Sequence, residues 1–336
     1  MDKENKKPLS SLGEFGLIKF IKDNNTHPRR YHQVHLDIGD DCFCFQSHKN
    51  SKYLVTTDIL IENTHFKKQW ATPEQIGQKA VEVNVSDIAS MGNAKPLYAF
   101  ISLGVPKNIE ENYVKRLFKS IKKTCQKYGI HISGGDTVSS EYITISITVI
   151  GISDSNIITR SKAKNKDLIC TTGTFGDSGA GLDILLKNKK KENLKQFEKN
   201  LIKRHLLPQA KITIANLISR NINITSMTDS SDGLFKSIEL LTTDNKKGAN
   251  INLNSIPISK DLQKFTNNNI QKIYNYALFG AEEFELVFTI NPIDKIKLQK
   301  LVPSISYIGV VNNTNEVEYF ENDQKRKIKY SGFKHF

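Results

Sequence analysis

Residues 72–106, TPEQIGQKAVEVNVSDIASMGNAKPLYAFISLGVP, contain the change from a helical to a strand pattern that decides the fold class. Thr72 followed by Pro73 is typical of a helix start, because proline fits the first helical turn, where its missing N–H is not needed. The helix is predicted to end at Gly92, and the β-branched and aromatic run at 98–106 predicts a strand. A helix that alternates with strands in this way favours an α/β or α+β architecture.

Segments on both sides continue this alternation. Strands are predicted at 53–61 and 143–153, and apolar residues at helical spacing between Val114 and Tyr128 predict an amphipathic helix. HISGGDT, at 131–137, is predicted to be a glycine turn. The second half begins with a strand at 167–173, followed by a small-residue loop, GTFGDSGAG, and a helix. Another helix is expected at 233–242, and the lysine-rich segment 187–203 is expected to be a solvated helix.

The length of 336 residues, with 38% hydrophobic and 25% charged residues, is typical of a globular chain of two domains. We place the boundary after the strand at 143–153, which gives one domain at 1–155 and another at 156–336. No stretch is apolar enough for a membrane span, and the N-terminus has no apolar signal-peptide run. A soluble, cytoplasmic, two-domain α/β (α+β) enzyme is therefore expected, with no membrane partner.

Cysteines and basic residues exclude other classes of protein. Four cysteines do not form a disulfide framework, and Cys42 and Cys44 are expected to be small core residues on one strand face. The net charge of +13 comes from lysines that are spread along the chain. Their densest runs lack the interleaved aromatic residues typical of single-strand binding, so no nucleic-acid partner is expected.

Acidic residues occur where they contribute little to folding. They lie at strand ends and in glycine turns: Asp40, Asp41, Asp58, Asp136, Asp229 and Asp232. Asp87 lies instead in the middle of the first predicted helix, among apolar neighbours. Buried carboxylates that converge must be protonated, paired or bound to cations. With the hydroxyl groups of Thr56, Thr57 and Ser231, such oxygen ligands suit Mg²⁺, which indicates phosphoryl chemistry on a nucleotide.

Known phosphate-binding signatures are absent from the sequence. There is no G-x-x-x-x-G-K-[ST] motif, and no kinase glycine-rich loop followed by H-R-D and D-F-G, which excludes a P-loop protein and a protein kinase. The loop 173–181 has the spacing G-x-x-G-x-x-G, which by itself is weak evidence for a phosphate site.

Several motifs together resemble one family, the bacterial thiamine-monophosphate kinases. In chain order they are IGDDC, VTTDILIENTHF, KAVEVNVSDIASMGNAKP, ISGGDT, TRSKAKNKDLICTTGTFGDSGAGL, IKRHLLPQAK, DSSDGL, ALFGAEEFELVFT and GFKHF. The resemblance extends from about Gly13 to the C-terminus. It implies the two-domain fold of aminoimidazole ribonucleotide synthetase, with an N-terminal domain that binds ATP and Mg²⁺ and forms a homodimer through its sheet. The C-terminal domain would complete the cleft.

The resemblance also implies an activity and a set of site residues. The family transfers the γ-phosphoryl group of ATP directly to thiamine monophosphate, with several Mg²⁺ ions, in the last step of thiamine diphosphate biosynthesis. The positions that match metal ligands are Asp41, Thr56, Thr57, Asp58, Asp87, Asp136, Asp229 and Asp232. Positions that match ATP contacts are Gly135, Asp136, Arg160 and Ser231, and those that match thiamine contacts are His65, Glu282 and Tyr330. A phosphate acceptor is already anionic, so no general base is expected.

The sequence departs from the family pattern on the substrate side. The usual GGEDYEL segment reads GAEEFEL at 280–286, and the usual S-G-A segment reads Ser161-Lys162-Ala163. Ala281 adopts a positive φ less readily than glycine, and Glu283 is one methylene longer than aspartate. These changes are expected to alter the geometry around the acceptor.

Three other interpretations compete with this one. An ATP-dependent synthetase or kinase of the same superfold with another acceptor is the nearest alternative. Selenophosphate synthetase would need a reactive cysteine near the N-terminus, and a hydrogenase-maturation relative would need a C-terminal cysteine; neither is present. A basic nucleic-acid-binding module does not explain so many carboxylates at strand ends. A non-catalytic paralogue does not explain why the acidic positions are intact.

Overall fold

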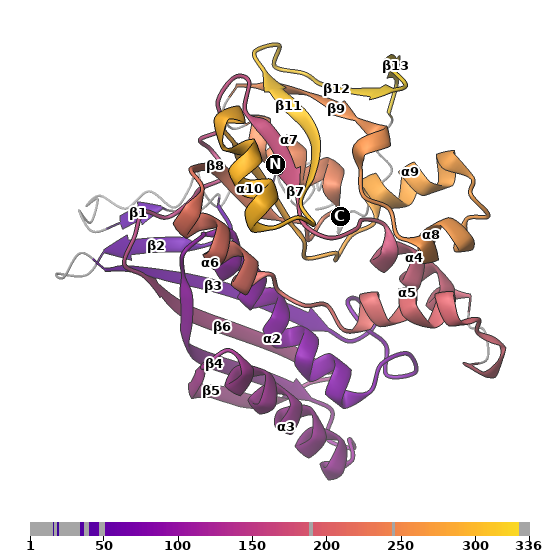
Figure 1. Cartoon of the computed structure of the whole chain (residues 1–336). Coiled ribbons are helices and arrows are strands. Elements are labelled where there is room, and N and C mark those ends of the chain that lie inside the picture. The colour runs from indigo at the N-terminus through magenta and orange to yellow at the C-terminus, as the bar shows by residue number, and fades with distance from the viewer. Residues whose placement is uncertain are drawn as a thin grey trace, which may run out of the picture.

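The computed structural model describes residues 16, 19, 34–36, 40–46, 51–187, 191–243 and 246–328. Two mixed β-sheets dominate this part of the chain, one from each half of the sequence (Figure 1). This arrangement agrees with the predicted two-domain α/β (α+β) fold. The boundary at residue 155 stays a prediction, although it falls between the last strand of the first sheet and the first strand of the second.

The first sheet is antiparallel except at one edge. In spatial order it comprises β1 (Val34–Leu36), β2 (Phe43–Gln46), β3 (Lys52–Ile61), β6 (Thr144–Ser153), β4 (Lys95–Val105) and β5 (His131–Ser139). Only β4 and β5 run parallel. Residues of β3 and β4 alternate between a buried and a more accessible face, as expected for strands with one covered side.

The second sheet is also mixed. In spatial order it comprises β13 (Gln324–Arg326), β12 (Val317–Glu321), β9 (Gly248–Asn252), β11 (Ser306–Asn312), β7 (Leu168–Thr171), β10 (Leu286–Ile290) and β8 (Ile224–Asp229). Strands β8 and β10 are buried along their whole length, because both faces of the sheet are covered there.

From residue 51 onward, in the described part of the chain, the α-helices are α2 (Pro73–Ser90), α3 (Glu111–Lys127), α4 (Asp177–Leu186), α5 (Gln196–Leu206), α6 (Ile212–Asn221), α7 (Leu234–Thr243), α8 (Lys260–Phe265), α9 (Ile270–Phe279) and α10 (Lys295–Leu301). Short 3₁₀ turns lie at Lys191–Asn193, Leu253–Ser255 and Pro292–Asp294. No helix in the described ranges has the length and apolar character needed to cross a membrane.

Helix α2 connects the two halves of the molecule. It starts as predicted, with a capping box in which the Thr72 hydroxyl accepts from the N–H of Gln75 and the Gln75 side chain accepts from the N–H of Thr72. Together with α3 it covers one face of the first sheet, and its other side packs against α6 and β8 (Figure 1). Glu82 accepts a hydrogen bond from the N–H of Ala210 at 2.7 Å. The helix is therefore buried along most of its length.

Three local predictions differ from the structure. The segment HISGGDT is not a turn but the first part of strand β5, because parallel pairing with β4 outweighs the turn preference of Gly134 and Gly135. The loop predicted at 173–181 ends early, since α4 begins at Asp177. Helix α5 is not fully solvated, because Glu198 and Leu201 are buried. Cys42 and Cys44 are buried and reduced, as predicted.

The second face of the first sheet is open and exposes several large apolar side chains. Phe43, Ile59, Tyr98, Phe100 and Val138 are each 39–57% exposed. They belong to strands β2, β3, β4 and β5 and lie on the side opposite α2 and α3, while β6 contributes Ser146 and Thr148 between them. We refer to these five residues as the open face.

Candidate active site

A cleft of about 1090 Å³ lies where β3 and α2 meet α4, α9 and the loop after α9. It contains many of the residues that the sequence analysis selected. Its walls include Asp58, His65, Asp87, Ser231, Asp232 and Glu282. The fold thus joins predicted metal, nucleotide and thiamine positions from both halves of the chain in one cavity.

Asp58 and Asp87 form the centre of a carboxylate cluster. Asp58 lies on the helix-facing side of β3, and Asp87 lies opposite it on α2. Their carboxyl groups share a hydrogen bond, and the Thr56 hydroxyl donates another to Asp87. Burial and the mutual charge of the two groups raise the pKa of Asp87 well above its usual range. Burial also raises the pKa of Asp58.

Asp229 and Asp41 extend the cluster beyond the cleft wall. Asp229 ends β8 and accepts a hydrogen bond from Ser86 of α2 at 2.5 Å. Burial, followed by the charge of Asp41, raises the pKa of Asp229 to about 8. Asp41 accepts a hydrogen bond from Thr228 through Oδ1, whereas its buried Oδ2 has no hydrogen-bond partner.

These carboxylates fit Mg²⁺ chemically. Burial and like charges make their ionised forms unfavourable, and a divalent cation would reverse that effect. The unpartnered Oδ2 of Asp41 is a further oxygen that a cation would satisfy. Within the described residues, however, no three acidic, histidine or cysteine side chains are close enough to hold an ion by themselves. Mg²⁺ commonly binds through one or two carboxylates, with water and substrate phosphates as its other ligands, and the cluster suits that mode.

Asp40 and Asp41 have separate environments, although they are adjacent in sequence. Asp40 accepts from the N–H groups of Asp41 at 2.9 Å and Arg160 at 3.2 Å, so it organises the local backbone. The Arg160 guanidinium lies 3.4 Å from Asp41 and 3.6 Å from Asp40. Burial, then the neighbouring Asp41, raises the pKa of Asp40 to about 6. Arg160 therefore lies at the edge of the cluster.

Other predicted site residues lie elsewhere. Thr57 is exposed on the open side of β3, where its hydroxyl accepts a hydrogen bond from Thr148 at 3.0 Å. Gly135 and Asp136 lie in β5, which is separated from β3 by β6 and β4. Asp136 is exposed there and accepts from the N–H of Thr137. Tyr330 lies outside the described residues.

The loop 280–285 is tied to the loop that carries Ser231 and Asp232. The N–H of Glu282 donates to the carbonyl of Ser231 at 2.6 Å, and the N–H of Phe284 donates to the carbonyl of Ser230 at 3.0 Å. Glu282 and Phe284 have φ angles of 62° and 53°, in the left-handed region. The positive φ that the family pattern suggested for position 281 is therefore found at Glu282 and Phe284 of the same loop.

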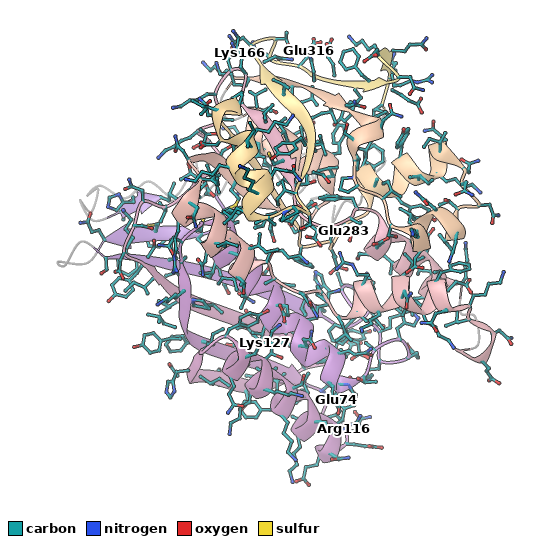
Figure 2. All side chains as sticks on the ribbon, in the orientation of Figure 1. Glu74, Arg116, Lys127, Lys166, Glu283 and Glu316 are labelled. Carbon is teal, nitrogen blue, oxygen red and sulfur yellow. The ribbon has the colours of Figure 1, made fainter. Side chains whose placement is uncertain are left out.

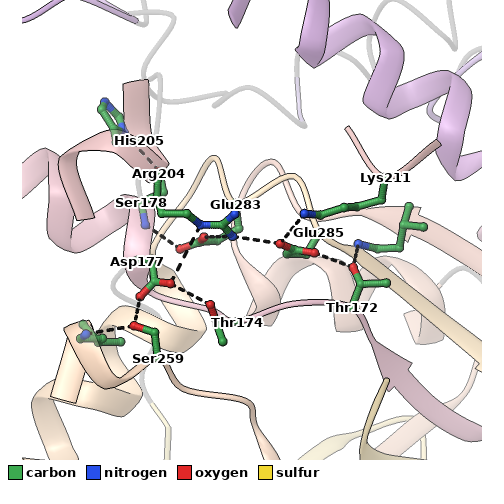
Figure 3. A network of polar contacts seen from close by, with 12 residues as sticks. Thr172, Thr174, Asp177, Ser178, Arg204, His205, Lys211, Ser259, Glu283 and Glu285 are labelled. Atoms are coloured by element: carbon green, nitrogen blue, oxygen red, sulfur yellow. Dashed lines mark hydrogen bonds and ion pairs between the residues drawn. The ribbon is translucent and has the colours of Figure 1, made fainter. Parts of the chain in front are cut away.

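A largely buried polar network contacts this loop on the side away from the cleft (Figure 3). Arg204 lies 2.9 Å from Glu285 and 3.7 Å from Glu283, and Lys211 lies 3.0 Å from Glu285. Glu283 accepts from the N–H of Ser178 at 2.8 Å, at the start of α4. Burial, followed by the charge of Asp177, raises the pKa of Glu283 to about 8 against the opposing charge of Arg204, which favours the protonated carboxyl at pH 7.

The sequence analysis did not select the residues of this network. The only signal was the alternation of residues in EEFE at 282–285, where positions 283 and 285 face the network while 282 and 284 line the cleft. The partner Arg204 belongs to the motif IKRHLLPQAK, about eighty positions away, and no local pattern links the two segments.

Comparison with known proteins places this geometry in a family. Residues 39–153 match the model of the AIR synthase related protein N-terminal domain. The thiamine-monophosphate kinase of Buchnera aphidicola subsp. Schizaphis graminum is 36% identical over 330 residues, which cover 96% of this chain and 98% of that protein. The structure of AaThiL complexed with AMPPCP and TMP is 33% identical, with a TM-score of 0.86, and the match covers 99% of this chain and 100% of that one.

A more distant structure shares the fold alone. The hydrogenase maturation protein HypE of E. coli is 16% identical, with a TM-score of 0.68, over 84% of this chain and 87% of that one. The 36% identity to a thiamine-monophosphate kinase extends over nearly the full length of both chains, unlike the 16% identity to HypE. It agrees with the family motifs whose residues line the cleft. The chain belongs to the thiamine-monophosphate kinase family.

Proposed function

We propose that the protein transfers the γ-phosphoryl group of ATP to the phosphate of thiamine monophosphate, which yields thiamine diphosphate and ADP. The observation that carries this proposal is the cleft, where a buried carboxylate cluster and Glu282 lie together. The family relationship and the likeness to a structure complexed with AMPPCP and TMP support both substrates.

The main obstacle to this reaction is repulsion between two phosphate anions. The acceptor oxygen is already ionised, so the protein needs no general base, and direct in-line transfer follows. Asp41, Asp58, Asp87, Asp229 and Asp232 are the residues that would hold Mg²⁺. When bound, Mg²⁺ neutralises phosphate charge and orients the reacting groups. The rigid placement of Asp58 and Asp87 on β3 and α2 provides the preorganisation that such a site requires.

Side chains around the cluster would bind the organic parts of the substrates. Arg160, beside Asp41, and Ser231, in the cleft wall, are suited to nucleotide phosphates. His65 and Glu282 are suited to thiamine. The Nδ1 atom of His65 accepts from the N–H of Ile61 at 3.0 Å, which directs the Nε2 side of the ring away from the backbone of β3. Tyr330 stays a proposed thiamine contact.

The active form is proposed to be a homodimer that associates through the open face. Large apolar side chains that are exposed on a sheet face are costly in water, and a second copy would bury them. This arrangement also offers a role for Gly135 and Asp136, which lie far along the sheet from Asp58 in their own chain. On the partner, they would be available to the other copy's nucleotide. The thiamine and ATP substrates favour a cytoplasmic location, and 1–155 and 156–336 are proposed as the domains.

The test is product formation by the purified protein with ATP, MgCl₂ and thiamine monophosphate, followed by chromatography. The variant Asp58→Asn keeps the side-chain volume but removes a charge, and it is expected to lose at least about 100-fold in kcat, because electrostatic stabilisation of this kind contributes several kcal/mol. Asp294→Asn is the matched control, because Asp294 does not line the cleft and its side chain makes no cap hydrogen bond. Equal activity of wild type and Asp58→Asn would refute the proposed metal role.

A further inference from the structure

Lys79 is a cationic residue in the middle of α2 that the site described so far does not use. Only 4% of its side chain is exposed, and its Nζ lies 2.6 Å from Oε1 of Glu282. Burial of an ammonium group is unfavourable unless a carboxylate or several acceptors compensate for the lost water. The partner of Lys79 is a carboxylate that lines the cleft, so the lysine acts on the cleft through Glu282.

The pair has a defined orientation. The side chain of Glu282 is 24% exposed, against 4% for Lys79, so the carboxylate faces the cavity and the ammonium lies behind it. Oε2 of Glu282 lies 3.4 Å from Nδ1 of His205. Burial, followed by the charge of Lys79, lowers the pKa of His205 to about 4, so His205 is neutral. Lys79 is thus the nearest charged partner of the Glu282 carboxylate.

The backbone reinforces this orientation. Glu282 has a φ of 62°, a left-handed conformation that residues with a Cβ adopt only when their surroundings enforce it. Its N–H is held by Ser231, and the next residue, Glu283, is anchored at the start of α4. The backbone of the loop is therefore held on both sides of the Glu282 side chain, and the ammonium of Lys79 contacts one of its carboxylate oxygens.

We propose that Lys79 is a positioning residue, which holds the Glu282 carboxylate at the cleft surface as the counter-charge for a cationic ring of the acceptor. This inference rests on the proposed function, because the thiazolium ring of thiamine monophosphate carries a fixed positive charge. The proposal assigns different ligands to two kinds of carboxylate in the same cleft. Asp58 and Asp87 face each other and suit metal ions, whereas Glu282 is paired with an ammonium and suits an organic cation.

The test compares two acceptors in steady-state kinetics: thiamine monophosphate, and an isosteric analogue in which a neutral thiophene replaces the thiazolium. Lys79→Met and Glu282→Gln are each expected to raise the KM for thiamine monophosphate by about 10–100-fold, the loss typical of one charge-assisted contact. The KM for ATP should change by less than about 3-fold, since Lys79 pairs with Glu282 and precedes Asp87 on α2 by eight residues, about 12 Å along the helix. Wild type should prefer the cationic acceptor, and both variants should lose that preference.

Controls separate positioning from folding. Lys79→Arg keeps the charge and is expected to restore much of the preference. Lys127→Met is the control, because Lys127 of α3 forms a comparable ion pair with buried Glu82 of α2 at 2.8 Å but does not line the cleft. It should leave both KM values unchanged. If Lys79→Met fails to fold, Lys79→Arg and Glu282→Gln still report on acceptor preference.

Two results would overturn the inference. One is an active wild type that does not distinguish the cationic from the neutral acceptor. The other is a folded Lys79→Met variant with unchanged KM and preference. In both, the proposed function stands. A wild type that binds ATP and Mg²⁺ but phosphorylates neither acceptor would instead refute the proposed function, and this inference with it.

Discussion

Replacement of Glu283 by glutamine is predicted to make the protein more stable at pH 8 and to leave its stability nearly unchanged at pH 4.5. Glu283 is 3% exposed, and burial raises the pKa of its carboxyl group from 4.5 to about 8. Glutamine keeps the shape and the oxygen that accepts from the N–H of Ser178. The substitution therefore removes the ability to ionise without opening a cavity.

The sign and size of the effect follow from proton linkage. Between pH 4.5 and 8 the unfolded chain ionises this carboxyl, whereas the folded protein keeps it protonated. The free energy of unfolding therefore falls as the pH rises through this window, and it levels off above pH 8. At about 1.4 kcal/mol per pKa unit, and because the folded carboxyl is already half ionised at pH 8, the loss between pH 5 and 8 amounts to about 3.5 kcal/mol for wild type. Glu283→Gln lacks this contribution.

Urea denaturation at several pH values measures this difference directly. The aspartate cluster contributes equally to both proteins, so the difference between wild type and Glu283→Gln isolates one group. Glu74→Gln is the control, because Glu74 is paired with the exposed Arg116 far from Glu283 (Figure 2). The hydrogen bond with Arg116 lowers the pKa of Glu74 to about 2, so this substitution is expected to change the pH dependence of stability only at pH values below 4.5. Identical pH dependence of wild type and Glu283→Gln between pH 5 and 8 would show that the pKa of Glu283 is not raised in the folded protein.

Three further changes test packing, the buried network and assembly. Gly181→Ala would place a Cβ 2.3 Å from the carbonyl oxygen of Leu201, so we expect a loss of about 2 kcal/mol in urea denaturation, where alanine otherwise favours helices; a gain would refute the close contact. Arg204→Met leaves buried Glu285 without its nearest guanidinium, and we expect about 3 kcal/mol of destabilisation by the same measurement. Phe100→Asp on the open face is expected to convert a dimer to a monomer in light scattering, and an unchanged molar mass would contradict the proposed interface.

The elements that were predictable from sequence are those with strong local signals. Helix α2 starts where Thr72 and Pro73 indicate, and β3 lies where a β-branched run predicts it. Strand β5 was not predictable, because two glycines and an aspartate favour a turn, and only pairing with β4 makes them a strand. Tertiary contacts outweigh local preference in such a segment.

The site was predictable where its residues belong to motifs, and not where a contact joins distant segments. Asp58 and Asp87 were selected from their positions, and the fold brings them together. Neither Lys79 nor Arg204 was selected, because the sequence of a basic chain does not distinguish a buried lysine or arginine from the many exposed ones. Their roles depend on the loop at 282–285, which folds against them from a remote part of the chain.

Phosphorus NMR of a reaction mixture with ATP, MgCl₂ and thiamine monophosphate tests the central claim most directly. We expect the signal of the monophosphate to be replaced by two coupled signals of thiamine diphosphate, with one ADP formed for each molecule of thiamine diphosphate. Omission of MgCl₂ should prevent both changes. ADP and inorganic phosphate without thiamine diphosphate would show that the acceptor is water, and ATP consumption that is unaffected by thiamine monophosphate would contradict the account.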